Sequence, residues 1–134
     1  MAESTQIGSY HRLVLGTVQL GMKYGVANKT GKPDGELALQ IIKTAWENGI
    51  REFDIAQGYG DSESVLGEVF SKLGISNKVQ VISKFHSQID HLNQEILLAA
   101  LDESLNKLRI PKLDGILLHN ENSLDQWDQG FGEN

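Results

Sequence analysis

The chain has 134 residues, a formal net charge of −6 at pH 7, and no cysteine. Its length suits one domain with a hydrophobic core, and 40% hydrophobic with 22% charged residues is typical of a soluble globular protein. The acidic balance argues against a partner that is a nucleic acid or a membrane surface, and the lack of cysteine excludes disulfides and thiolate metal sites.

The N-terminal stretch MAESTQIGSYHR lacks the positive segment and apolar core of a signal peptide. The apolar runs elsewhere are far shorter than a membrane span requires. A chain without cysteine is compatible with a reducing compartment. We therefore expect a cytoplasmic protein with no membrane contact and no metal site.

The first half of the chain predicts two strands with a helix between them. Residues 12–18, RLVLGTV, form a short apolar run that leads into a polar joint, and residues 50–56, IREFDIA, form the second strand. Between them, residues 37–49 repeat apolar side chains at helical spacing, with Asp34 as the N-cap and Gly49 as a left-handed residue after the helix. The apolar stripe of this helix consists of Leu37, Ala38, Ile41, Ile42, Ala45 and Trp46.

The next helix is expected between a cap at Asp61 or Ser62 and a stop at Gly74. Its apolar face consists of Val65, Leu66, Val69, Phe70 and Leu73. Residues 78–85, KVQVISKF, predict a third strand.

The last predicted helix lies within residues 93–110, with Arg109 in its final turn and Pro111 beyond it. Its stripe is Leu97, Leu101, Leu105 and Leu108. A fourth strand follows at residues 112–120, KLDGILLHN. Strands that alternate with helices in this way predict an α/β fold with parallel strands and right-handed crossovers.

In parallel α/β folds, functional groups collect where strands end and loops lead to helices. Ionisable side chains stand at three of the four predicted strand ends: Asp54 and Tyr59 after the second strand, Lys84 after the third, and His119 after the fourth. Singly they could be a turn acid, a rim aromatic, a solvent-seeking lysine and a structural histidine. Together they would lie at one rim and form one pocket.

The combination suits proton delivery. A phenol has an ordinary pKa of about 10, and a nearby ammonium stabilises its ionised form. Asp54 would hold Lys84 in place, and His119 would orient a carbonyl oxygen or share in the proton relay. Protonation of a developing alkoxide is half of a carbonyl reduction, and the other half is a hydride that a nicotinamide supplies.

Four segments resemble the aldo-keto reductase family: LVLGTVQLG (13–21), FDIAQGYGDSESVLG (53–67), VISKF (81–85) and LDGILLHN (113–120). They are similar to its first strand, its D-x-A-x-x-Y-G joint, its strand-end lysine and its strand-end histidine. The resemblance implies an NADP(H)-dependent oxidoreductase that reduces a small aldehyde or ketone, with Tyr59 as proton donor. The implied catalytic residues are Asp54, Tyr59, Lys84 and His119. The implied cofactor-binding residues are Gly16, Thr17, Val18 and Asp54.

The family fold is a TIM (β/α)₈ barrel, which typically needs about 250 residues. We therefore expect residues 1–134 to form a single aldo-keto reductase-like domain, the first half of that barrel, truncated after its fourth strand. In the family, most residues that bind NADP(H) lie in the second half, so most of the usual cofactor-binding residues are expected to be absent from this chain.

Two alternatives stay open. The first is a catalytically inactive half-barrel, a fragment or an assembly piece of such an enzyme. Its open strand edges and apolar inner face would favour a homodimer that closes the barrel, or aggregation. The second is a lyase in which Lys84 forms a Schiff base, a chemistry that leaves the pairing of Asp54 with Tyr59 unexplained.

Overall fold

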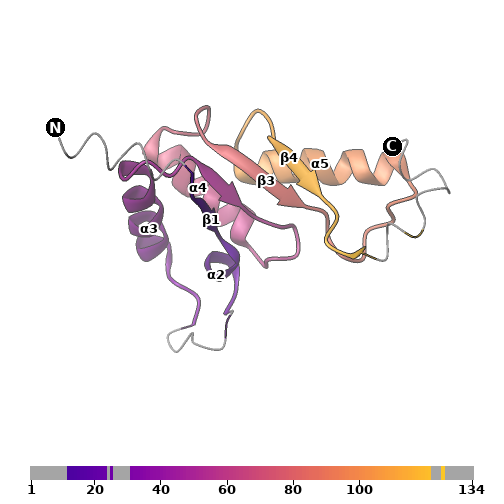
Figure 1. The fold of residues 1–134 in the computed structure, drawn as a ribbon, viewed down its shortest axis with the longest axis horizontal. Coiled ribbons are helices and arrows are strands. Elements are labelled where there is room, and N and C mark those ends of the chain that lie inside the picture. Colours follow the sequence, from indigo (N-terminus) through magenta and orange to yellow (C-terminus); the bar gives the residue numbers. More distant parts are fainter. Residues whose placement is uncertain (1–11, 24, 26–30, 122–124, 126–134) are drawn as a thin grey trace.

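The structure is a computed structural model that describes residues 12–23, 25, 31–121 and 125. Within these ranges, four strands form one parallel sheet in the order β1-β2-β3-β4 (Figure 1). The elements follow one another as β1 (Val14–Gly16), α2 (Val18–Gly21), α3 (Gly35–Glu47), β2 (Glu52–Asp54), α4 (Ser62–Leu73), β3 (Gln80–Lys84), α5 (Gln94–Leu108) and β4 (Gly115–Leu117). The predicted alternation of parallel strands and helices is confirmed.

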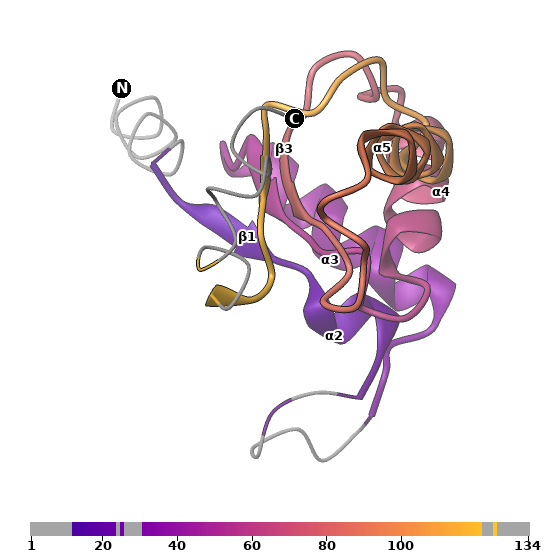
Figure 2. The ribbon, with the colours of Figure 1, turned by 90° about the vertical axis from the view of Figure 1, so that its right-hand side faces the viewer.

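The register of the strands decides which side chains share a face of the sheet. Gly16 lies beside Asp54, and Asp54 lies beside Ile82. Because side chains alternate between faces along a strand, Asp54 and Lys84 point to the same face. Helices α3, α4 and α5 gather on the other face (Figure 2). The side chains of Asp54 and Lys84 therefore project from the face that no described helix covers.

The core lies between the sheet and these helices. Phe53 of β2 and Phe70 of α4 are fully buried there, and their rings meet edge to face with centroids 5.2 Å apart. The surrounding buried cluster includes Leu20, Ala38, Ile42, Ile55, Leu66, Val69, Val81, Leu108 and Ile110. Burial of large apolar side chains is the main stabilising term for such a layer.

Several helix ends agree with the sequence. Asp34 caps α3, since its carboxylate accepts a hydrogen bond from the backbone N–H of Leu37 at 2.8 Å. Gly49 and Gly74 follow α3 and α4 with φ angles of 94° and 68°, the left-handed conformation that glycine adopts without strain. Asp61 precedes α4 as predicted, but its carboxylate pairs with Lys32 at 2.6 Å instead of capping the helix.

All four strands are shorter than the predicted ranges 12–18, 50–56, 78–85 and 112–120, and the first also ends in an unpredicted helix. We expected the first strand to extend over residues 12–18, but β1 ends at Gly16 and α2 begins at Val18. The hydroxyl and the backbone N–H of Thr17 both donate to the carbonyl oxygen of Asp54, at 2.8 and 3.1 Å. The backbone bond continues the parallel pairing of β1 and β2 by one step, the hydroxyl adds a second bond to the same oxygen, and the chain turns into α2 at the next residue.

Arg109 also departs from the sequence prediction. It lies just after α5 with a φ of 55°, and is not part of the last helical turn. Its backbone N–H donates to the carbonyl oxygens of Leu105 and Asn106, a left-handed helix end that is normally made by glycine. The reversal brings Ile110 back into the core, where it is buried.

Apolar side chains remain exposed at the two edges of the sheet. Val14 in β1 is 47% exposed and Leu117 in β4 is 53% exposed. Beside β1, the predicted stripe of α3 is only partly covered, since Leu37 and Ile41 are exposed while Ala38 and Ile42 are buried. A groove of about 400 Å³ lies here, lined by Leu15, Gln40, Ile41, Thr44 and Ala45. No helix in the described ranges is long and apolar enough to cross a membrane.

Candidate active site

The carboxylate and the ammonium predicted at neighbouring strand ends form an ion pair. The Nζ atom of Lys84 lies 2.5 Å from Oδ1 of Asp54 and donates a second hydrogen bond to the carbonyl oxygen of Ile55 at 3.0 Å. The side chain of Lys84 is only 15% exposed, while that of Asp54 is 40% exposed. The lysine is therefore fixed at both contacts on the open face of the sheet.

The phenol and the imidazole lie next to this pair. The Lys84 Nζ atom is 5.4 Å from the centroid of the Tyr59 ring. The rings of Tyr59 and His119 meet edge to face, with centroids 5.9 Å apart and planes at 84°. The structure thus brings Asp54, Tyr59, Lys84 and His119 together, although they come from three different strand ends.

Backbone hydrogen bonds shape the loop that carries Tyr59. The N–H of Gln57 donates to the carbonyl oxygen of Lys84 at 3.0 Å, which extends the pairing of β2 and β3 beyond the strands. The chain then turns, with the N–H of Tyr59 donating to Ala56 and the N–H of Ser62 donating to Tyr59, both at 3.1 Å. These bonds hold Tyr59 between the end of β2 and the start of α4.

Two glycines allow α2 to lie directly against this turn. A Cβ atom at Gly21 would stand 1.8 Å from the carbonyl oxygen of Tyr59, and one at Gly60 would stand 2.4 Å from the carbonyl oxygen of Gly21. Neither position can carry a side chain without moving the backbone. The buried hydroxyl of Ser62 adds a hydrogen bond to the carbonyl oxygen of Thr17 at 3.0 Å, so the first loop and the Tyr59 loop form one unit.

The residues expected near a cofactor lie at the end of β1, beside Asp54. Gly16 is exposed, and a Cβ atom there would meet no described residue within 4 Å, so the described part of the chain leaves the space next to it open. Thr17 is 1% exposed, and its hydroxyl is committed to Asp54, so its observed contacts hold the loop in place. Val18 is half-buried as the first residue of α2.

A polar cluster behind the Tyr59 loop was not predicted from the sequence. The hydroxyl of Ser104 in α5 donates to Oε1 of Glu63 in α4 at 2.7 Å, and both residues are buried. Gln57 donates from its side-chain amide to the same Ser104 hydroxyl at 2.9 Å. The sequence does contain one sign of this cluster. Ser104 occupies a position of the apolar stripe formed by Leu97, Leu101 and Leu108, where an apolar residue is expected.

The electrostatics of this cluster centre on Glu63. Burial raises the pKa of the Glu63 carboxyl above its ordinary value of 4.5. The hydrogen bond from Ser104 and the positive charge of Lys107 oppose that rise in pKa. On the exposed side of α5, the Glu103 carboxylate is paired with Lys107 at 2.6 Å, which lowers the pKa of Glu103. Within the described ranges, no three acidic or histidine side chains come together as a metal-binding group.

Known proteins are similar to this chain in sequence and in fold. The model of the aldo/keto reductase family matches residues 12–126. Methylglyoxal reductase DkgB of Salmonella typhi is 34% identical over 85 residues, which cover 63% of this chain and 31% of that protein. The crystal structure of PA4992 from Pseudomonas aeruginosa, which is described as 'the putative aldo-keto reductase', has a TM-score of 0.72 at 28% identity over 86% of this chain. A Bombyx mori aldo-keto reductase in complex with NADP has a TM-score of 0.60 at 26% identity over 79% of this chain.

The lengths of these relatives place the four strands in a larger fold. The chain spans 31% of the length of the DkgB protein and 45% of the PA4992 chain. Its parallel strands and helices therefore correspond to about half of the TIM barrel of the structural relatives, as the sequence predicted. With a family model that matches most of its residues, the chain belongs to the aldo/keto reductase family.

Proposed function

We propose that the chain carries the proton-donating half of an NADP(H)-dependent reductase that acts on a small aldehyde or ketone. The observation that supports this most directly is the convergence of Asp54, Tyr59, Lys84 and His119 on the open face of the sheet. Within this set, the Tyr59 phenol is the proton donor to the developing alkoxide. Membership of the family favours a reductase over a Schiff-base lyase, a chemistry in which Tyr59 has no role.

The contacts give each side chain a part in the reaction. Asp54 and the Ile55 carbonyl hold the Lys84 ammonium near the Tyr59 ring, where its charge favours the phenolate left after proton transfer. His119 packs against the edge of that ring and can orient the carbonyl oxygen of the substrate. A donor held in place before the reaction avoids the cost of ordering it in the transition state.

The residues present suit the nicotinamide end of a cofactor. The open space over Gly16 adjoins Asp54, and Thr17 fixes the loop that borders it. We propose that Gly16, Thr17, Val18 and Asp54 border the nicotinamide, which would supply the hydride. The Bombyx mori relative was solved in complex with NADP, which supports this choice of cofactor.

The test of the proton donor compares Tyr59→Phe, which removes only the phenolic hydroxyl, with the wild type. Carbonyl-dependent oxidation of NADPH is measured for the assembled protein. General acid catalysis contributes about 10²- to 10⁴-fold, so Tyr59→Phe should lower kcat/KM by that factor. A Tyr59→Phe enzyme that kept its rate would show that another group delivers the proton.

We further propose that two copies of the chain complete the barrel as a homodimer. β1 and β4 lie at opposite edges of the parallel sheet, and apolar side chains are exposed at both. A two-fold axis along the barrel would pair β1 of one copy with β4 of the other at both seams, with all strands parallel. Sedimentation at tens of micromolar should detect the dimer, and a stable soluble monomer would contradict it. An NADPH fluorescence titration then measures whether the assembly binds the cofactor. Saturable binding would indicate a complete cofactor site, and its absence would indicate an inactive half-barrel.

A further inference from the structure

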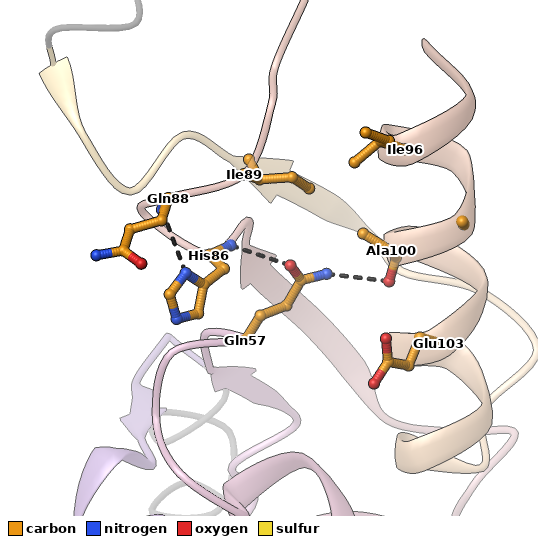
Figure 3. A pocket seen from close by; sticks show the side chains of 8 residues that line it. Gln57, His86, Gln88, Ile89, Ile96, Ala100 and Glu103 are labelled. Carbon is orange, nitrogen blue, oxygen red and sulfur yellow. Dashed lines mark hydrogen bonds between the residues drawn. The ribbon is translucent and has the colours of Figure 1, made fainter. Parts of the chain in front are cut away.

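The side chain of Gln57 joins three segments of the chain through its two polar atoms. Its amide nitrogen donates to the carbonyl oxygen of Ala100 at 3.0 Å and to the hydroxyl of Ser104 at 2.9 Å, both in α5. Its carbonyl oxygen accepts from the backbone N–H of His86 at 3.0 Å, in the loop between β3 and α5. Figure 3 shows this side chain stretched between His86 and the helix.

This side chain lies two residues before Tyr59, with only Gly58 between them. A Cβ atom at Gly58 would stand 3.8 Å from the His86 ring and 3.9 Å from the His119 ring, so the chain passes between two imidazoles at this point. Gly58 itself has no side chain with which to fix that position. The nearest side-chain anchor of the Tyr59 loop toward α5 is therefore Gln57.

The anchor is well supported on the helix side. Ser104 accepts from Gln57 and in turn donates to the buried Glu63 carboxyl at 2.7 Å, so a continuous chain of hydrogen bonds runs from the loop into the α4–α5 packing. Buried polar groups of this kind are costly to leave unpaired, so each member restricts the others. The groove in front of it, about 430 Å³ and lined by His86, Ile89 and Ile96 among others, leaves the other side of Gln57 open.

We propose that Gln57 is a positioning residue for the Tyr59 phenol. Its carboxamide holds the Tyr59 loop against α5 and the β3–α5 loop, so that the phenol keeps its place between Lys84 and His119. The inference depends on the proposed function only in naming Tyr59 as the proton donor. The positional effect itself is measurable in a protein that does not turn over.

The test replaces Gln57 with methionine, which has a similar length and volume but no matching donor or acceptor. The matched control is Gln88→Met, because Gln88 lines the same groove and contributes only its backbone N–H, which donates to the His86 ring at 3.2 Å. Amide hydrogen exchange should accelerate at His86 by about tenfold in Gln57→Met, while the control stays at the wild-type rate. The amides of Ile55 and Phe85, which bond within the sheet ladder, should not change in either variant.

A second measurement follows the phenol itself. The nuclear Overhauser effect between the ring protons of Tyr59 and His119 reports their edge-to-face contact, and Tyr59→Phe assigns it. The effect should fall at least severalfold in Gln57→Met and persist in Gln88→Met. An undiminished effect in a folded Gln57→Met protein would overturn the proposal. So would global unfolding of Gln57→Met together with Gln57→Glu, because Gln57 would then support the whole fold and not the position of Tyr59.

Turnover provides the remaining readout in the assembled enzyme. Gln57→Met should lower kcat by about 10²-fold, as a misplaced catalytic group does, and leave the KM for NADPH unchanged. If Tyr59→Phe keeps full activity but Gln57→Met loses the Tyr59–His119 contact, the assignment of the proton donor fails and the positional role of Gln57 stands. If instead Tyr59→Phe loses activity and Gln57→Met keeps the Tyr59–His119 contact, Tyr59 remains the proton donor and Gln57 has no positioning role.

Discussion

The contact between α4 and α5 gives a sharp prediction, because it depends on one glycine. A Cβ atom at Gly67 in α4 would stand 2.0 Å from the carbonyl oxygen of Lys107 and 2.9 Å from the carbonyl carbon of Leu108. Both are backbone atoms, which cannot rotate away as the end of a side chain can. Substitution of Gly67 by alanine must therefore push the two helices apart.

Two opposing effects decide the sign of this change. Alanine favours a helix over glycine by about 1 kcal/mol, which stabilises the variant. Separation of the helices by roughly 1.5 Å restores an ordinary contact but opens the core, and such overpacking costs about 1–3 kcal/mol or more. The shift also pulls Ser104 away from the buried Glu63 carboxyl. We expect a net loss of about 2 kcal/mol and a melting temperature that is lower by roughly 5–10 °C.

The assay is thermal and urea denaturation followed by circular dichroism, with Gly35→Ala as the control. Gly35 is the first residue of α3, and a Cβ atom there would meet nothing within 4 Å. Gly35→Ala should therefore be as stable as the wild type or slightly more stable. If Gly67→Ala matched Gly35→Ala in stability, the close approach of α4 and α5 would be wrong.

Two other predictions concern charged groups. Burial raises the pKa of the Glu63 carboxyl above 4.5, so the folded state binds the carboxyl proton more firmly than the unfolded chain does. Protonated Glu63 therefore contributes fully to the free energy of unfolding below pH 4.5, and this contribution is lost as pH rises through the folded-state pKa. Glu63→Gln should therefore gain stability relative to wild type between acid and neutral pH, and a constant difference in urea denaturation would contradict this. Asp54→Asn removes the negative charge that pairs with the largely buried Lys84 ammonium and leaves it only neutral acceptors, the new amide oxygen and the Ile55 carbonyl, and should cost about 1–2 kcal/mol. The matched change Glu103→Gln breaks an exposed pair with Lys107 and should cost much less; equal losses would refute the structural role of the Asp54 pair.

That Asp54, Tyr59, Lys84 and His119 lie together could be predicted from the sequence because parallel topology brings the strand ends to one edge. Once the strands alternate with helices, all their C-terminal ends must lie at one edge, so side chains at those ends meet without further information. Topology together with the chemistry of a carboxylate beside an ammonium predicted that Asp54 would hold Lys84, and the two side chains form an ion pair. The helix end at Gly74 and the helix cap at Asp34 were predicted correctly because each depends only on a few neighbouring residues.

What the sequence did not predict depends on contacts between distant segments. The turn at Thr17 is fixed by a side-chain hydrogen bond to the Asp54 carbonyl 37 residues away, which no local pattern reveals. Arg109 adopts a left-handed conformation because Ile110 is drawn into the core, although a propensity rule would place glycine there. In both cases the prediction from local sequence was wrong because it took no account of contacts between distant segments.

The polar cluster around Gln57 shows where such distant contacts can leave a trace in the sequence. Its hydrogen bonds to α5 join residues 41 to 47 positions apart, so their pairing could not be read from spacing. Yet Ser104 stands at an apolar position of the α5 stripe, and Glu63 is buried in the first turn of α4. A polar residue at a core position must find a partner, because an unpaired buried donor or acceptor would destabilise the fold. When two such residues lie on helices that a glycine allows to touch, a hydrogen bond between them satisfies both, and the loop that leads into one of the helices is the first place to look for a third partner.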